Sequence, residues 1–193
     1  MKTTACLAVS FMLGLAGCAR GPDATEQAAL VASAREAAAR LATGLGAELK
    51  AAIAEQGPDG AIGVCKVRAP ESAAALSRQH GMEITRVSPK NRNPAGVPDA
   101  WEAKAQSQLE ERLAAGEKPE SLDTWEVVSA AEGKQFRYAK ALPTQPMCLL
   151  CHGNADDIPA SVKARLAAEY PQDKAIGYRA GMVRGIVSVK RPL

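Results

Sequence analysis

The sequence predicts an α+β domain in which helices surround a mostly antiparallel sheet. Near the N-terminus, residues 26–56 are rich in Ala, Leu, Glu, Lys and Arg, with apolar residues at helical spacing. Further on, 124–130 and 135–142 have strand composition and flank Glu132-Gly133-Lys134, which predicts a β-hairpin. Two more strand-like segments, 82–88 and 182–189, are separated by helical and loop sequence.

The first expected element is one long amphipathic helix over 26–56, which Gly57-Pro58 ends. Its length would support packing on the domain, a two-helix contact or a dimer. A short helical turn over 61–67 follows and is interrupted before Pro70. A second helix should run from there to about His80 and end at Gly81.

The remaining elements follow in order. After the strand at 82–88, the Pro- and Asn-rich segment 89–98 predicts a structured loop. Asp99 can cap a helix that runs through Ala115 and is closed by Gly116. The hairpin comes next, and after it a helix over 159–169 with proline in its first turn, before the final strand.

The strongest functional signal is the pentapeptide Cys148-Leu149-Leu150-Cys151-His152. In a C-x-x-C-H motif the two thiols form thioether bonds to haem, and the imidazole becomes the proximal ligand of the iron. A single motif predicts a single, covalently bound haem c.

Two other classes of site use C-x-x-C. A thioredoxin-like pair lies where a strand runs into a helix, whereas the residues on both sides of this motif (143–146 and 153–154) have loop composition. A structural zinc site needs a second pair of ligands at similar spacing, and Cys65 and His80 are far apart and unpaired. The haem interpretation is therefore preferred.

The N-terminus predicts export. Lys2 precedes an apolar stretch, 5–17, which is too short to span a bilayer. It ends in Leu15-Ala16-Gly17-Cys18, which resembles a bacterial lipobox. The resemblance implies a signal peptide over 1–17 and lipidation of Cys18, with an ordinary secretory signal as the alternative. Residues 18–25 would form a tether and 26–193 the folded domain.

By resemblance to lipoprotein sorting in Gram-negative bacteria, Ala19 after the lipidated cysteine implies the outer membrane, facing the periplasm. The anchor would give the protein its membrane contact. A net charge of +3 with both signs interspersed indicates no nucleic-acid binding.

The five cysteines yield a further inference. Cys6 leaves with the signal peptide, Cys18 would carry lipid, and Cys148 and Cys151 would carry haem. Cys65 is then a lone thiol in an oxidising compartment, so it must be buried, bonded or reactive. Helical spacing places it on one apolar face with Ala61 and Ile62.

An ordered set of motifs extends over most of the chain. It comprises Cys65 with Ala69-Pro70, then 86–94, 98–102, 148–153, Gly177-Tyr178 and Arg184-Gly185. This set resembles a family of bacterial single-haem c-type domains with a PAS-like fold, which occur alone or as sensors of kinases and chemotaxis receptors. The resemblance covers about residue 26 to the C-terminus and implies a PAS-like fold here. Val87 departs from the Thr that is more common in the family.

The family position of Cys65 implies that this thiol is the sixth ligand of the haem iron, opposite His152. His80 is the alternative distal ligand, although its place beside Gly81 marks a helix end. Met82 and Met182 lie in strand-like segments and are expected in the core. Arg86, Arg92 and Arg184 are candidate partners of the haem propionates, because a guanidinium group suits a carboxylate.

Three classes of function remain. The first is a redox or small-ligand (gas) sensor that acts through an unidentified periplasmic partner, and the second is a one-electron transfer cytochrome. The third is a haem catalyst, which ranks last because the sequence places no acid–base pair for it.

Overall fold

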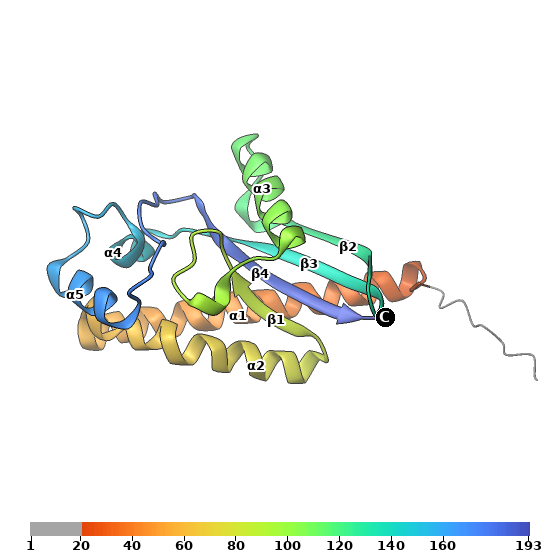
Figure 1. The fold of residues 1–193 in the computed structure, drawn as a ribbon, viewed down its shortest axis with the longest axis horizontal. Coiled ribbons are helices and arrows are strands. Elements are labelled where there is room, and N and C mark those ends of the chain that lie inside the picture. The colour runs from red at the N-terminus through yellow and green to blue at the C-terminus, as the bar shows by residue number, and fades with distance from the viewer. Residues whose placement is uncertain (1–20) are drawn as a thin grey trace, which may run out of the picture.

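The computed structural model describes residues 21–193, so the predicted signal peptide and Cys18 lie outside the described residues. A four-stranded sheet forms the centre of the domain, with helices on both faces (Figure 1). The predicted α+β class with a PAS-like antiparallel sheet and a long N-terminal helix is confirmed.

The strands are β1 (Glu83–Val87), β2 (Asp123–Ala130), β3 (Gly133–Pro143) and β4 (Val183–Pro192), in the spatial order β1-β4-β3-β2. Every neighbouring pair is antiparallel. The β2–β3 pair is the predicted hairpin, with Trp125 opposite Tyr138. The first strand and the last strand pair across about a hundred residues of chain, so β1 forms one edge of the sheet beside β4.

One face of the sheet is covered by α1 (Ala24–Gly60) and α2 (Ala69–His80). Asp23 caps α1 in a capping box with Glu26, so the helix begins two residues before the predicted start. At Gly57, φ is 76°, a value that suits glycine, and this residue breaks the helix where the sequence predicts its end. The core on this face is formed by Leu30, Val31, Ala34, Ala37, Ala38, Leu41, Ala73, Leu76, Met82, Ile84, Phe136, Tyr138, Val187 and Val189.

This packing uses the apolar face of α1 inside the molecule, against α2 and the sheet. The sequence left three uses of this helix open: packing on the domain, a two-helix contact or a dimer. The structure shows packing on the chain's own domain.

The opposite face carries α3 (Ala100–Ala114), with Asp99 as its cap as predicted. Glu102 of this helix is only 2% exposed and accepts a hydrogen bond of 2.6 Å from Ser188 of β4. The carboxylates of α3 and its cap also pair with Arg137 and Lys190 of the sheet. An ionic layer therefore joins α3 to the sheet beside an apolar core that includes Leu109 and Ile186.

A smaller lobe lies at one end of the sheet (Figure 1). It contains α4 (Leu149–His152) and α5 (Ala160–Glu169), and its own core joins the end of α1 to α5 through Ile62, Ile158, Val162, Leu166 and Tyr170. Short turns complete the fold: η1 (Val64–Arg68), η2 (Pro94–Gly96), η3 (Pro119–Ser121) and η4 (Pro146–Cys148).

Candidate functional site

A cavity of about 450 Å³ opens between α2, the ends of β1 and β4, and the small lobe. Its wall on α2 is made of small residues, Ala69, Ala73 and Ala74, which leave room that larger side chains would fill. The opposite wall is polar and includes three arginines. The predicted site residues that line the cavity are Cys65, Arg86, Arg92, His152 and Arg184.

The C-x-x-C-H motif lies on a helical turn rather than in the predicted loop. Residues 146–148 form η4 and residues 149–152 form α4, because Pro146 starts a turn that continues into the motif. Cys148 and Cys151 are three residues apart on this turn and are half-buried free thiols. Burial raises the pKa of the Cys151 thiol.

His152 is held at its Nδ1 side. Nδ1 lies 2.7 Å from the carbonyl oxygen of Ala175, and since a carbonyl only accepts, Nδ1 carries the proton. The Nε2 lone pair is therefore free to bind a metal. The backbone also fixes this residue, because the N–H of Tyr178 donates to the His152 carbonyl at 2.9 Å.

The charge state of His152 suits a ligand. Burial is the largest cause that holds its pKa well below the usual range, and the nearby Arg184 and Arg92 guanidinium groups act in the same direction. The imidazole is thus neutral at physiological pH. Neutral imidazole is the form that binds iron.

Arg92 fixes the small lobe to the rest of the domain. It is 8% exposed and pairs with Asp173 at 2.9 Å. Its Nη2 also donates to the Cys151 carbonyl at 2.6 Å and lies 3.4 Å from the Ala175 carbonyl that receives the His152 proton. One side chain from the loop after β1 therefore supports both the motif and the orientation of the imidazole.

Arg184 is largely buried at the start of β4, and Arg86 lies at the end of β1. Within residues 21–193 neither has a carboxylate at ion-pair distance. The Nε of Arg184 lies 3.2 Å from His152 Nδ1, but Nδ1 cannot accept from it while it donates to the shorter contact with Ala175, so this is a close approach and not a hydrogen bond. The guanidinium carbon of Arg184 lies 5.2 Å from the centre of the Tyr178 ring. Burial lowers the pKa of Arg184, and the charges of Arg86 and Arg92 lower it further. The cavity thus has uncompensated positive charge.

Cys65 reaches the same cavity from a different helix. It lies in η1, which is a π-helical turn that joins α1 to α2. Such turns are rare and are frequent at functional sites. Ala61 and Ile62, its predicted neighbours on an apolar face, are buried at 1% and 4% exposure, while Cys65 is half-buried. The structure therefore brings Cys65 and His152 to one cavity.

The alternative ligands lie elsewhere. His80 is at the end of α2, where Gly81 adopts φ 62°, and its Nδ1 is 2.9 Å from Ser33 of α1. It does not line the cavity. Met82 is buried in the core below α1, whereas Met182 is 39% exposed, unlike the core position that was predicted for it.

Sequence reasoning missed Asp173 and Ala175, which hold Arg92 and His152. They are 81 and 23 residues from those partners, and one of the two contributes only a backbone carbonyl. No local signal in the sequence marks them.

Among the helices of residues 21–193, none combines the length and the apolar composition that a bilayer-spanning segment needs.

Comparisons with known proteins find one matching family model and one similar solved structure. The model of the Tll0287-like family matches residues 21–192. Among solved structures, the crystal structure of the cyanobacterial haem protein Tll0287 aligns with a TM-score of 0.59 and 21% identity, covering 89% of this chain and 97% of that one. No curated protein matches the sequence.

Proposed function

This chain belongs to the Tll0287-like family, and on that premise we propose that it is a c-type haem protein with one haem bound covalently through Cys148 and Cys151. The observation that carries the proposal is the cavity into which His152 of the motif and Cys65 of η1 both extend. When bound, the haem would supply an iron that changes between the ferric and ferrous states.

The residues present fit that group in shape. The cavity has an apolar wall on α2 for a flat macrocycle, and the motif borders it through His152. Its volume of about 450 Å³ is in the range of cofactor pockets.

They also fit in charge. Arg86 and Arg184 line the cavity without carboxylate partners among the described residues. Arg184 is largely buried, where a guanidinium group without a counterion is costly, whereas Arg86 is exposed and adds positive charge at the cavity. The two propionates of haem would supply negative charge to both. Arg92 already pairs with Asp173, although it also lines the cavity and stays a candidate contact.

We assign His152 as the proximal ligand and Cys65 as the distal one. The first assignment rests on the free Nε2 and the hydrogen bond of Nδ1 to Ala175. The second rests on the presence of Cys65 in the same cavity, since the charge of a metal favours the thiolate form of a cysteine. His80 is the weaker candidate because its ring contacts Ser33 outside the cavity.

The role that best fits this site is a redox or small-ligand sensor that acts through a partner. Cys65 is on the turn that connects α1 and α2, so a change in its bonding would act on both helices. One-electron transfer is the second candidate, since the same ligand pair would serve a carrier. In either role we propose a periplasmic protein anchored through Cys18 to the outer membrane.

The test of haem attachment is direct. The full chain is produced in a host that matures c-type cytochromes, denatured and examined by intact mass and by the pyridine haemochrome spectrum. We expect one haem per chain, its loss in the Cys148→Ala/Cys151→Ala variant and its retention in Cys65→Ala. Denatured wild-type protein that lacks the extra mass would refute the proposal.

A second measurement separates the two roles. Addition of CO or NO to the reduced protein, with displacement of Cys65, supports sensing. Rapid reduction and oxidation with unchanged ligation in both states supports electron transfer.

A further inference from the structure

Two segments that are hydrogen-bonded to the haem motif and to Gly153 after it have a net positive charge. Residues 86–92 and 173–184 contain six Lys and Arg residues and one carboxylate, a net charge of +5. The whole chain has a net charge of +3, so the rest of the molecule has a net charge of −2. The cations are Arg86, Lys90, Arg92, Lys174, Arg179 and Arg184.

The fold brings these two segments together. The N–H of Lys174 donates to the Asn91 carbonyl at 3.1 Å, and Lys90 Nζ donates to the Ile176 carbonyl. The second segment is also bound to the motif, because Gly177 N–H donates to the Gly153 carbonyl at 2.7 Å. The second segment is therefore held next to the backbone of the haem motif.

Part of this surface is exposed and without counterions. Lys90, Lys174 and Arg179 are exposed, and no described carboxylate pairs with them. Ile176, between them in sequence, is 39% exposed. We call these four residues the basic rim; an exposed apolar residue among unpaired cations is the composition of a docking surface for an acidic partner.

We propose that the basic rim is the docking surface for an acidic protein that exchanges one electron with the haem. This inference rests on the proposed haem. Complementary charge would raise the rate of encounter and orient the partner at the end of the molecule that contains the motif.

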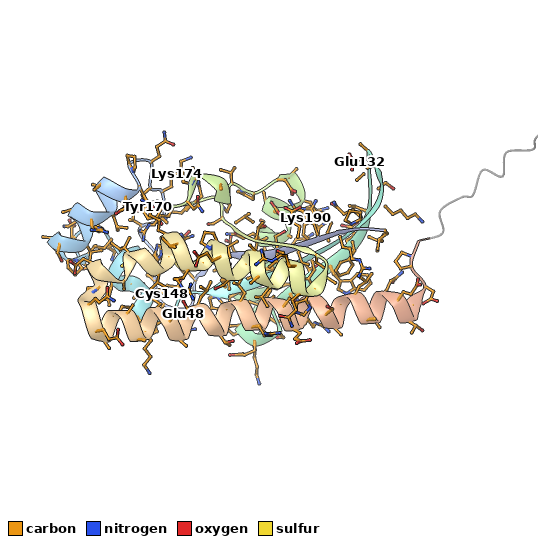
Figure 2. The ribbon with its side chains drawn as sticks, turned by 90° about the horizontal axis from the view of Figure 1, so that it is seen from below. Glu48, Glu132, Cys148, Tyr170, Lys174 and Lys190 are labelled. Carbon is orange, nitrogen blue, oxygen red and sulfur yellow. The ribbon has the colours of Figure 1, made fainter. Side chains whose placement is uncertain are left out.

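The position of the rim favours a soluble partner over a membrane. Lys174 lies at the same end of the molecule as Cys148, and Glu132 lies at the opposite end (Figure 2). The described chain begins at that opposite end, since Gly21 is beside Lys134. A protein anchored through its N-terminus would thus present the rim away from the lipid.

The experiment reverses charge at two places. The rim variant is Lys174→Glu/Arg179→Glu, and the matched control is Lys134→Glu/Arg191→Glu, which makes the same change in charge at the distant end, where β3 begins and β4 ends. Each full-length haem protein is reduced, and its oxidation by ferricyanide is followed by stopped flow across a range of ionic strengths. In each reaction the ferrous iron loses one electron and ferricyanide becomes ferrocyanide.

We expect wild type and control to react fastest at low ionic strength, and the rim variant to react about tenfold more slowly there with a weaker or reversed dependence on salt. With the cationic oxidant tris(phenanthroline)cobalt(III), the rim variant should instead react faster than wild type. Equal rates for the rim and control variants, both with full haem content, would overturn the inference while leaving the proposed function intact. Phosphatidylglycerol vesicles that bind wild type but not the rim variant would assign the rim to a membrane and also overturn it.

Discussion

Cys65 is the residue on which the chemistry of the proposed iron site depends most. Replacement of this thiol by Ala should change the ferric optical and EPR spectra, because a thiolate ligand would be lost from the distal side. The matched variant is His80→Ala, which should leave both spectra unchanged since His80 lies outside the cavity. If His80→Ala changes the ferric spectra and Cys65→Ala does not, His80 and not Cys65 is the distal ligand.

Arg92 should contribute to stability through its buried ion pair. Arg92→Met leaves Asp173 half-buried without its partner, and we expect a loss of about 3 kcal/mol in the free energy of unfolding. Arg165→Met is the comparison, because Arg165 is 56% exposed in its pair with Glu169 and should contribute less than about 1 kcal/mol. Urea denaturation of the two variants measures the difference. Equal losses of unfolding free energy in the two variants would show that burial does not make the Arg92–Asp173 pair more stabilising than the exposed pair.

The sequence predicts the residues that are proposed to bind haem but not the residues that hold them in place. Cys148, Cys151 and His152 are recognised because their spacing is dictated by covalent chemistry. Cys65 is found by elimination and by resemblance. Asp173 could not be predicted from the sequence, since its partner Arg92 is 81 residues away and an acidic residue in a loop is common. Long-range pairing leaves no trace in a single sequence.

Among the elements, α3 offers a clean test of capping. Asp99 accepts a hydrogen bond of 2.9 Å from the Glu102 N–H and also pairs with Arg137. Asp99→Asn keeps a capping oxygen and removes the charge, whereas Asp99→Ala removes both. We expect the Ala variant to be less stable than the Asn variant by about 1 kcal/mol in thermal or urea unfolding. If the two variants are equally stable, the ion pair and not the cap is what stabilises this end.

Element boundaries follow the sequence where local chemistry decides them. Asp99, Gly81 and Gly57 mark helix ends that the structure confirms, since each supplies a cap or a backbone conformation that few residues adopt. The haem motif itself was predicted as loop and forms a helical turn, because the flanking Pro and Gly residues obscure four helical residues between them. The short helical turn predicted over 61–67 is found as η1 at Val64–Arg68, but its π-helical hydrogen bonding was not predicted.

For the molecule as a whole, stability should fall in acid. Burial acts to raise the pKa of Asp123, but the hydrogen bond and charge of Arg35 outweigh burial, and the pKa stays below the ordinary value of 3.8. This carboxylate joins α1 to the sheet, since it also accepts a hydrogen bond of 3.1 Å from Tyr138. Burial raises the pKa of Tyr138, so the phenol remains a donor at all moderate pH values.

Because the folded pKa of Asp123 is depressed, its contribution to stability is complete above the unfolded value and is lost as pH falls through the folded one. We expect the urea midpoint to decline between about pH 5 and about pH 2, and to decline less in Asp123→Asn. A wild-type curve parallel to that of the Asn variant would exclude Asp123 as a source of the acid sensitivity.

The distribution of charge is also a property of the whole molecule. In the sequence the two signs are interspersed, and the net charge of +3 suggests neither nucleic-acid nor polyanion binding. Folding brings 86–92 against 173–184, and hydrogen bonds such as the one from Lys174 to Asn91 gather their cations at the end of the molecule that contains the motif. Fold class and cofactor motif were predictable from the sequence, whereas this surface exists only after the two loops meet.

The length of α1 sets a stand-off distance. The part of α1 before its break at Gly57, residues 24–56, corresponds to roughly 50 Å of helix. Gly21 lies near Lys134 before its start, and the Pro58 carbonyl oxygen lies 4.0 Å from the Cys151 sulfur just beyond the break. If the chain is anchored to a membrane by its first residues, the proposed haem would lie at the far end of this helix. If this helix stands along the membrane normal, it would hold the haem motif roughly 50 Å from the bilayer, which favours soluble proteins over membrane-embedded redox centres as electron donors.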